Sequence, residues 1–138
     1  MRRHFDSTIP SLALNLLRII TGFLLIPHGA RKLLGMFGGV GGQPGATAPL
    51  FSLIGLAGVL EFFGGLAILL GLFTRPVAFV LSGLMAVAYF MAHAPKGFWP
   101  LLNRGELAAI YSFVFFFLAA TGGGELSIDG LLRKRKRR

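Results

Sequence analysis

Glu61 is the residue whose type and position most strongly point to chemistry, because it lies near the middle of a long apolar run. The run, Leu53 to Phe73, has 21 residues and one ionisable group. That length matches the roughly 20 residues that an α-helix needs to cross a hydrocarbon layer about 30 Å thick. A carboxylate at that depth costs at least about 2.5–3.5 kcal/mol. Glu61 therefore needs a partner, a proton or water.

Other polar side chains lie in or beside the apolar stretches of the chain. They are Arg18, His28, Tyr89, His93 and Glu106. Charged groups within membrane spans normally face the interior of a helix bundle. A buried set of acid, histidine and tyrosine suits proton-coupled quinone chemistry, because quinone carbonyls need hydrogen-bond donors and quinone reduction needs protons delivered into a dry site.

We predict a quinone site from this set. The positions of His28, His93 and Glu106 along their helices place them in one layer near the outer surface, with Glu61 deeper at the floor of a pocket. His28, Glu61 and His93 are the predicted catalytic residues. The residues expected to bind the quinone are His28, Tyr89, His93 and Glu106.

Alternatives stay open for the same residues. Glu61 also suits an ion pair with Arg18, or a hydrogen bond to a histidine, that fixes the register of the helices. Glu106 also suits the first turn of a helix, where the helix dipole favours an anion. His28 and His93 form a pair that suits haem, and with Glu106 a set that suits a metal ion. We take a quinone as the expected ligand in preference to haem or a metal ion.

The composition is that of an integral membrane protein. Of the 138 residues, 54% are hydrophobic and 14% charged, and the mean hydropathy is +0.73. A soluble domain of this size needs more charge on its surface. The net charge of +9 comes largely from the two ends, as in basic segments that face anionic lipid, and no domain shaped to bind nucleic acid remains. The absence of cysteine excludes dithiol oxidoreductases and cysteine-ligated iron–sulfur clusters.

The predicted fold is all-α, an integral membrane four-helix bundle formed by a single domain over residues 1–138. The expected helices cover about 11–34, 51–72, 76–93 and 104–121. Ser11 and Thr74 are the expected N-caps. Gly71 is expected to end the second helix.

Glycines and basic residues complete the predicted architecture. The glycines beside Glu61 are expected to let neighbouring helices approach closely, and they are Gly55, Gly58, Gly64 and Gly65. A glycine-rich loop should follow the first helix. A short amphipathic piece over residues 126–132 should lie on the membrane before the basic tail, residues 133–138.

The distribution of basic residues predicts the orientation. Four spans place both ends on one side, and that side holds nine basic residues, Arg2 and Arg3 among them, against four on the other. The positive-inside rule then puts both termini in the cytoplasm. We therefore expect a multi-pass protein of the bacterial inner membrane.

Short motifs along the chain carry a family resemblance. They are Arg18, Pro27-His28-Gly29-x-x-Lys32-Leu33, the glycine-rich loop, Glu61-x-x-Gly64-Gly65-x-x-x-x-x-Gly71-x-x-Thr74-Arg75, His93 with Gly97-Phe98, Gly105-Glu106-Leu107 and Leu126-Ser127-Ile128-Asp129. With these motifs the chain resembles the DoxX family of four-helix bacterial membrane proteins over essentially its full length. The resemblance implies the fold and a redox or quinone role, because the family includes a membrane subunit of thiosulfate:quinone oxidoreductase and proteins associated with oxidative-stress or thiol-redox complexes.

Two hypotheses of function follow. The leading one is an inner-membrane protein that supports redox chemistry as the quinone-side subunit of an oxidoreductase complex, with a redox protein or a second copy of the chain as its partner. The alternative is a non-catalytic membrane anchor or assembly factor for a partner enzyme. Because the chain has no cysteine, any sulfur chemistry would take place on the partner.

Overall fold

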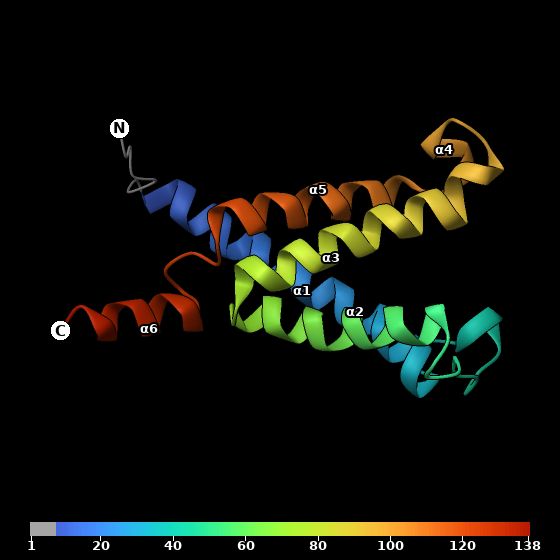
Figure 1. Cartoon of the computed structure of the whole chain (residues 1–138), viewed down its shortest axis with the longest axis horizontal. Helices are drawn as coiled ribbons and strands as arrows, with labels where there is room; N and C mark the ends of the chain where they lie inside the picture. The colour runs from blue at the N-terminus through green and yellow to red at the C-terminus, as the bar shows by residue number, and fades with distance from the viewer. Residues whose placement is uncertain (1–7) are drawn as a thin grey trace. The chain divides into compact units, whose positions relative to one another are not determined.

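The computed structural model describes residues 8–138, in which the regular secondary structure is helical and no strand occurs (Figure 1). The α-helices are α1 (Thr8–Leu34), α2 (Leu53–Leu70), α3 (Thr74–Ala88), α4 (Pro100–Asn103), α5 (Glu106–Thr121) and α6 (Ile128–Lys136). A π-helical turn, Tyr89–His93, and a 3₁₀ turn, Ala94–Lys96, continue α3. Another 3₁₀ turn, Val40–Gly42, lies in the glycine-rich loop. The predicted all-α class is confirmed.

Within residues 8–138, three helical stretches are long and apolar enough to cross a membrane: Thr8–Leu34, Leu53–Leu70 and Thr74–Lys96. The helix α5 is also apolar but has only 16 residues, which correspond to about 24 Å at 1.5 Å per residue. Three long apolar helices and a shorter one are the elements expected of a membrane helical bundle.

Several helix ends differ from the prediction. The helix α1 begins at Thr8 and not at Ser11, because proline is tolerated in the first turn and Pro10 therefore does not delay the helix. The last apolar helix begins at Glu106, after the separate short helix α4. The tail is more helical than expected, since α6 continues into the basic run as far as Lys136.

The chain forms two compact units, which we describe separately. The first unit comprises the chain up to Thr74 together with Gly123–Arg138, and the second comprises Arg75–Gly122. Residues 1–7, which include Arg2 and Arg3, lie outside the described residues.

In the first unit, α1 and α2 pack closely along matched glycines. Gly22 and Gly29 of α1 are two turns apart, and so are Gly58 and Gly65 of α2. A Cβ atom on Gly22 would lie 2.5 Å from the nitrogen of Leu69 and 2.8 Å from the oxygen of Gly65. The helices therefore touch backbone to backbone, as small residues allow in membranes. The expected role of Gly58 and Gly65 is confirmed.

Arg18 binds the end of this helix pair at which α2 ends. Its side chain is 1% exposed, and its guanidinium donates to four backbone carbonyl oxygens. They belong to Ile68 (2.9 Å), Leu69, Gly123 (2.8 Å) and Leu126 (2.7 Å). The last carbonyls of a helix have no partner within it, so Arg18 satisfies the end of α2 and fixes the C-terminal segment beside it.

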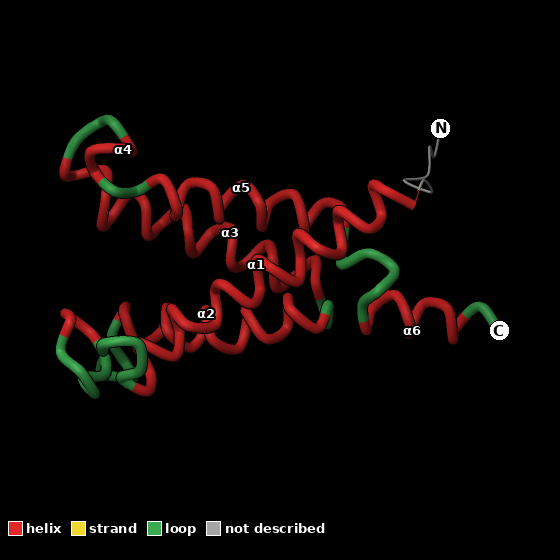
Figure 2. The backbone as a smooth tube through the Cα atoms, turned by 180° about the vertical axis from the view of Figure 1, so that it is seen from behind, coloured by secondary structure: helices red, strands yellow, loops and turns green. Residues whose placement is uncertain are grey.

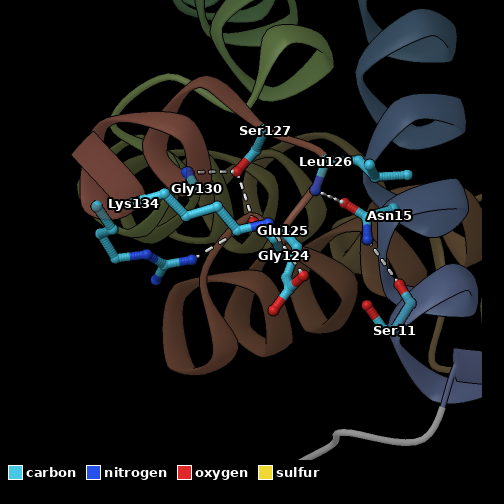
Figure 3. Close-up of polar contacts among 9 residues, drawn as sticks. Ser11, Asn15, Gly124, Glu125, Leu126, Ser127, Gly130 and Lys134 are labelled. Atoms are coloured by element: carbon cyan, nitrogen blue, oxygen red, sulfur yellow. Dashed lines mark hydrogen bonds and ion pairs between the residues drawn. The ribbon is translucent and has the colours of Figure 1, made fainter. Parts of the chain in front are cut away.

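The turn after α2 is held by the C-terminal segment. Gly71 ends α2 in the left-handed conformation, as predicted. Asp129 accepts hydrogen bonds from the backbone nitrogens of Phe73 (2.9 Å) and Thr74 (2.8 Å). The predicted capping by Thr74 is wrong, because Asp129 takes that role and the buried Oγ1 of Thr74 has no hydrogen-bond partner among the described residues. The Asn15 side chain accepts from the Leu126 nitrogen on the same segment (Figure 3).

In the second unit, α3 and α5 lie side by side and antiparallel (Figure 1 and Figure 2). Near their middle, the hydroxyl of Ser82 donates to the carbonyl of Ser112 (2.8 Å), and the hydroxyl of Ser112 donates to the carbonyl of Ser82 (3.0 Å). At the start of α3, Arg75 donates to the carbonyls of Ala120 and Thr121 at the end of α5. Side-chain hydrogen bonds between helices are a common means of association in an apolar solvent.

Gly29→Ala should destabilise the protein, because the added methyl group would lie 2.6 Å from Cβ of Phe62 and 2.7 Å from the oxygen of Gly58. Overpacking of this kind costs about 1–3 kcal/mol. The matched control is Gly83→Ala on α3, where a Cβ meets nothing within 4 Å, so this change should be neutral or stabilise by up to about 1 kcal/mol. The free energy of unfolding in detergent micelles measures both, and equal effects would contradict the close approach of α1 and α2.

Candidate functional site

The second unit contains a polar cluster at the end of α3, built from Tyr89, His93 and Asn103. The π-helical turn places the rings of Tyr89 and His93 in a stacked arrangement, with centroids 6.4 Å apart and planes inclined by 28°. Such π-turns are frequent at functional sites. Both side chains are half-buried, and Asn103 is 1% exposed.

Asn103 organises this cluster through every polar group of its side chain. Its amide nitrogen donates to the Tyr89 hydroxyl (3.3 Å) and to the carbonyl of Gly97 (2.9 Å). Its side-chain oxygen accepts from the nitrogen of Gly105 (2.8 Å). Gly105 is required there, because a Cβ atom would lie 2.6 Å from the Tyr89 ring. The cluster is therefore held rigidly between the end of α3 and the start of α5.

The same residue fixes the protonation pattern of His93. The Nδ1 atom of His93 lies 3.0 Å from the backbone oxygen of Asn103. A carbonyl oxygen can only accept, so Nδ1 carries the proton and Nε2 is the basic nitrogen of the neutral ring. His93 can therefore accept a proton at Nε2 and return it. The hydroxyl of Tyr89 accepts from Asn103, which leaves its own hydrogen available for donation.

The first unit contains a second polar feature, a buried ion pair between α1 and α2. The Lys32 nitrogen lies 2.5 Å from a carboxylate oxygen of Glu61, whose side chain is 7% exposed, while that of Lys32 is 26% exposed. Gly58 makes this possible, because a Cβ there would lie 2.9 Å from Cβ of Lys32. The expectation that Glu61 needs a partner is confirmed, and the partner is Lys32. Pairing with Arg18 is wrong, because the Arg18 guanidinium binds backbone carbonyls instead.

Comparison with known proteins identifies the family. The DoxX family model matches residues 13–94, which include both Glu61 and His93. The chain belongs to the DoxX family. No solved structure matches it.

Three curated relatives extend the similarity over most of this DoxX protein. It is 41% identical to a Haemophilus influenzae protein named "Uncharacterized protein", over 86% of this chain and 90% of the relative. It is 37% identical to "Inner membrane protein YqjF" of Escherichia coli (strain K12), with the same two coverages. It is 30% identical to "Putative oxidoreductase CatD" of Bacillus subtilis (strain 168), over 88% of each chain. With the apolar helices, these findings support a bacterial inner-membrane protein.

The predicted site residues of this DoxX protein divide between the two units. Glu61 and His28 belong to the first unit, and Tyr89, His93 and Glu106 belong to the second. The structure brings Tyr89 and His93 together, pairs Glu61 with Lys32, and places His28 and Glu106 at exposed positions. Glu106 occupies the first turn of α5, as expected of a helix-start carboxylate. A pocket shared by all five residues stays a prediction.

Metal binding gains no support within the part of the chain that is described. No group of three or more histidine, cysteine, aspartate or glutamate side chains among residues 8–138 is arranged to hold a metal ion.

Sequence reasoning missed Asn103 and Lys32. Asn103 precedes Arg104, whose backbone is in the left-handed conformation. Asparagine side chains near turns and glycines often form hydrogen bonds to nearby backbone groups, and Asn103-Arg104-Gly105 has this pattern. Lys32 lies near the end of the first predicted helix, and the sequence alone does not show that it meets Glu61. Lys32 reaches Glu61 because the folded helices place its Cβ against Gly58, one turn before Glu61.

Lys32→Met should destabilise this DoxX protein by about 3 kcal/mol, because it leaves the buried Glu61 carboxylate without its cation. The double variant Lys32→Met/Glu61→Gln should lose less than the single variant, since it removes the uncompensated charge as well. Lys96→Met, at an exposed position, is the matched control and should change stability by no more than about 0.5 kcal/mol. Unfolding in micelles of the wild type, Lys32→Met, Glu61→Gln and the double variant gives the coupling energy. Additive losses would show that the pair contributes nothing.

Proposed function

We propose that this DoxX protein supports redox chemistry in the membrane by binding a quinone at the cluster of Tyr89, His93 and Asn103. The observation that carries the proposal is the His93 ring, whose Nδ1 atom is engaged with the Asn103 carbonyl and whose basic nitrogen is therefore Nε2. The name of the relative CatD, "Putative oxidoreductase", supports a redox role. The chain would act as the quinone-side subunit of an oxidoreductase complex.

The residues of the cluster fit the chemistry of a quinone. Reduction of a quinone to a quinol takes two electrons and two protons, and a redox-active partner protein would supply the electrons. His93, protonated at Nε2, donates a proton to one quinone oxygen, and the Tyr89 hydroxyl donates a hydrogen bond to that oxygen or to the other. The second proton comes from water at the membrane surface. Glu106, in the first turn of α5, is proposed to serve the same site as a proton carrier.

A second candidate function is that of a non-catalytic membrane anchor or assembly factor. The observation that favours it is the internal engagement of the charged groups in the first unit. Arg18 binds four backbone carbonyls and Glu61 is paired with Lys32, as in groups that fix helix register rather than react. In this case the protein would bind its partner without any quinone.

Quinone titration of the purified protein in lipid nanodiscs separates the two candidates. His93→Ala should weaken quinone binding at least about tenfold, because it removes a charge-assisted hydrogen bond and one wall of the ring stack. Ser82→Ala, which removes a hydrogen bond elsewhere on α3, is the control and should leave quinone affinity unchanged.

The same variants also test whether the substituted residues have only a structural role. Thermal stability is measured on each of them, so that a loss of binding can be compared with a loss of fold. Unchanged quinone affinity in a well-folded His93→Ala variant would refute the quinone site. Losses of activity that only follow losses of stability would favour the anchor or assembly factor.

We also propose that both termini face the cytoplasm. The basic run Arg133–Arg138 and Arg75 carry most of the charge asymmetry in the described residues, and Arg31, Lys32, Lys96 and Arg104 lie on the opposite side of the predicted topology. Reporter fusions after Arg138 and at Arg75 should therefore report cytoplasm, and a fusion within residues 39–45 should report the outer side. A periplasmic signal from the C-terminal fusion would reverse the orientation.

A further inference from the structure

We propose that α6 and the basic residues that follow it form a fixed binding surface for anionic phospholipid headgroups. Six consecutive basic residues, Arg133–Arg138, occupy the second half of this helix and the residues beyond it. All six are exposed. The proposal concerns the first unit alone and does not depend on the quinone site.

The start of α6 is fixed to the helix pair by several hydrogen bonds. The backbone nitrogen of Asp129 donates to the carbonyl of Gly71 (3.0 Å), while its carboxylate accepts from the turn after α2. Ser127 caps the helix by accepting from the nitrogen of Gly130 (3.0 Å) and donates to the carbonyl of Gly124 (2.6 Å) (Figure 3). The helix is therefore attached at a defined place, and not through a free linker.

That place is the end of a membrane-length helix. Gly71, to which Asp129 is bonded, directly follows Leu70, the last residue of α2. The distance along α6 from Asp129 to Lys136 is about 10 Å at 1.5 Å per residue. The basic residues of α6 thus lie within about 10 Å of the end of α2, which is the depth of the headgroups beside a membrane-length helix.

The two kinds of exposed side chain on α6 fit a lipid surface and not a soluble ligand. Leu131 is 64% exposed and Leu132 is 49% exposed, although both precede a run of charges. Exposed leucines beside arginines and lysines are typical of helices that lie in the membrane interface. Among residues 8–138, this basic run forms an ion pair of Lys134 with Glu125, at 3.4 Å, which joins two exposed side chains. Such pairs contribute little, so they neutralise little of the charge.

A single fluorescent label tests the proposal on the full chain. The sequence has no cysteine, so Leu131→Cys carries an environment-sensitive dye at one position only. In nanodiscs that contain phosphatidylglycerol the dye should move to an apolar environment and be protected several-fold from an aqueous quencher. In pure phosphatidylcholine it should remain accessible. Raising the salt from about 0.1 to about 1 M shortens the screening length from about 10 to about 3 Å and should reduce the protection.

The matched control removes the charges and keeps the helix. The labelled chain with Arg133→Gln, Lys134→Gln, Arg135→Gln and Lys136→Gln should lose the protection in phosphatidylglycerol, because each basic residue near an anionic surface contributes about fivefold to binding. Equal protection in the two lipids would overturn the proposal. A second outcome would also overturn it. If the dye in phosphatidylcholine became protected from the quencher only after an oligonucleotide or an acidic polypeptide was added, this would show that the surface binds a soluble polyanion.

Discussion

The guanidinium of Arg18 is the interaction on which the first unit depends. A charge in an apolar interior is tolerated only when its hydrogen-bonding groups are satisfied, and here the end of α2 and the segment from Gly123 to Leu126 supply carbonyl oxygens for that purpose. Arginine suits this role, because its donors lie in a fixed plane and reach several acceptors at once. A lysine presents three donors from a single nitrogen and would reach fewer of these carbonyls. One side chain thus joins α1, α2 and the base of α6.

Close packing and polar contact are coupled in the same unit. The matched glycines of α1 and α2 allow backbone contact, and this contact sets the antiparallel register of the two helices. The register in turn places the stem of Lys32 over Gly58 and its nitrogen against Glu61. The second unit uses hydroxyls and an amide instead, from Ser82, Ser112 and Asn103. A polar cluster on a rigid frame is suited to holding a ring and a proton donor in one geometry.

The sequence predicted those features that depend on residues close together in the chain. It did not predict contacts between segments that are far apart in the chain. The apolar runs and the end of α2 at Gly71 follow from hydropathy and from the conformational freedom of glycine, so they were predicted. A partner for Glu61 was also expected, because a buried carboxylate requires one. Its identity as Lys32, and the capping of the α2–α3 turn by Asp129, depend on segments that meet only in the folded chain. The neutral Asn103 was overlooked, because its importance comes from the backbone turn that follows it.

The carbonyl partners of Arg18 also impose an order on biosynthesis. The guanidinium enters the membrane with α1, but Ile68 follows 50 residues later and Gly123 follows 105 residues later. At a synthesis rate of about 5–20 residues per second, the last partners emerge about 5–20 s after Arg18. During that interval the charge depends on water or lipid headgroups for its remaining hydrogen bonds. Synthesis of the C-terminal segment ends this state. The membrane proteases and insertion machinery of the cell therefore act on a chain whose Arg18 site is completed only when its last residues have been made.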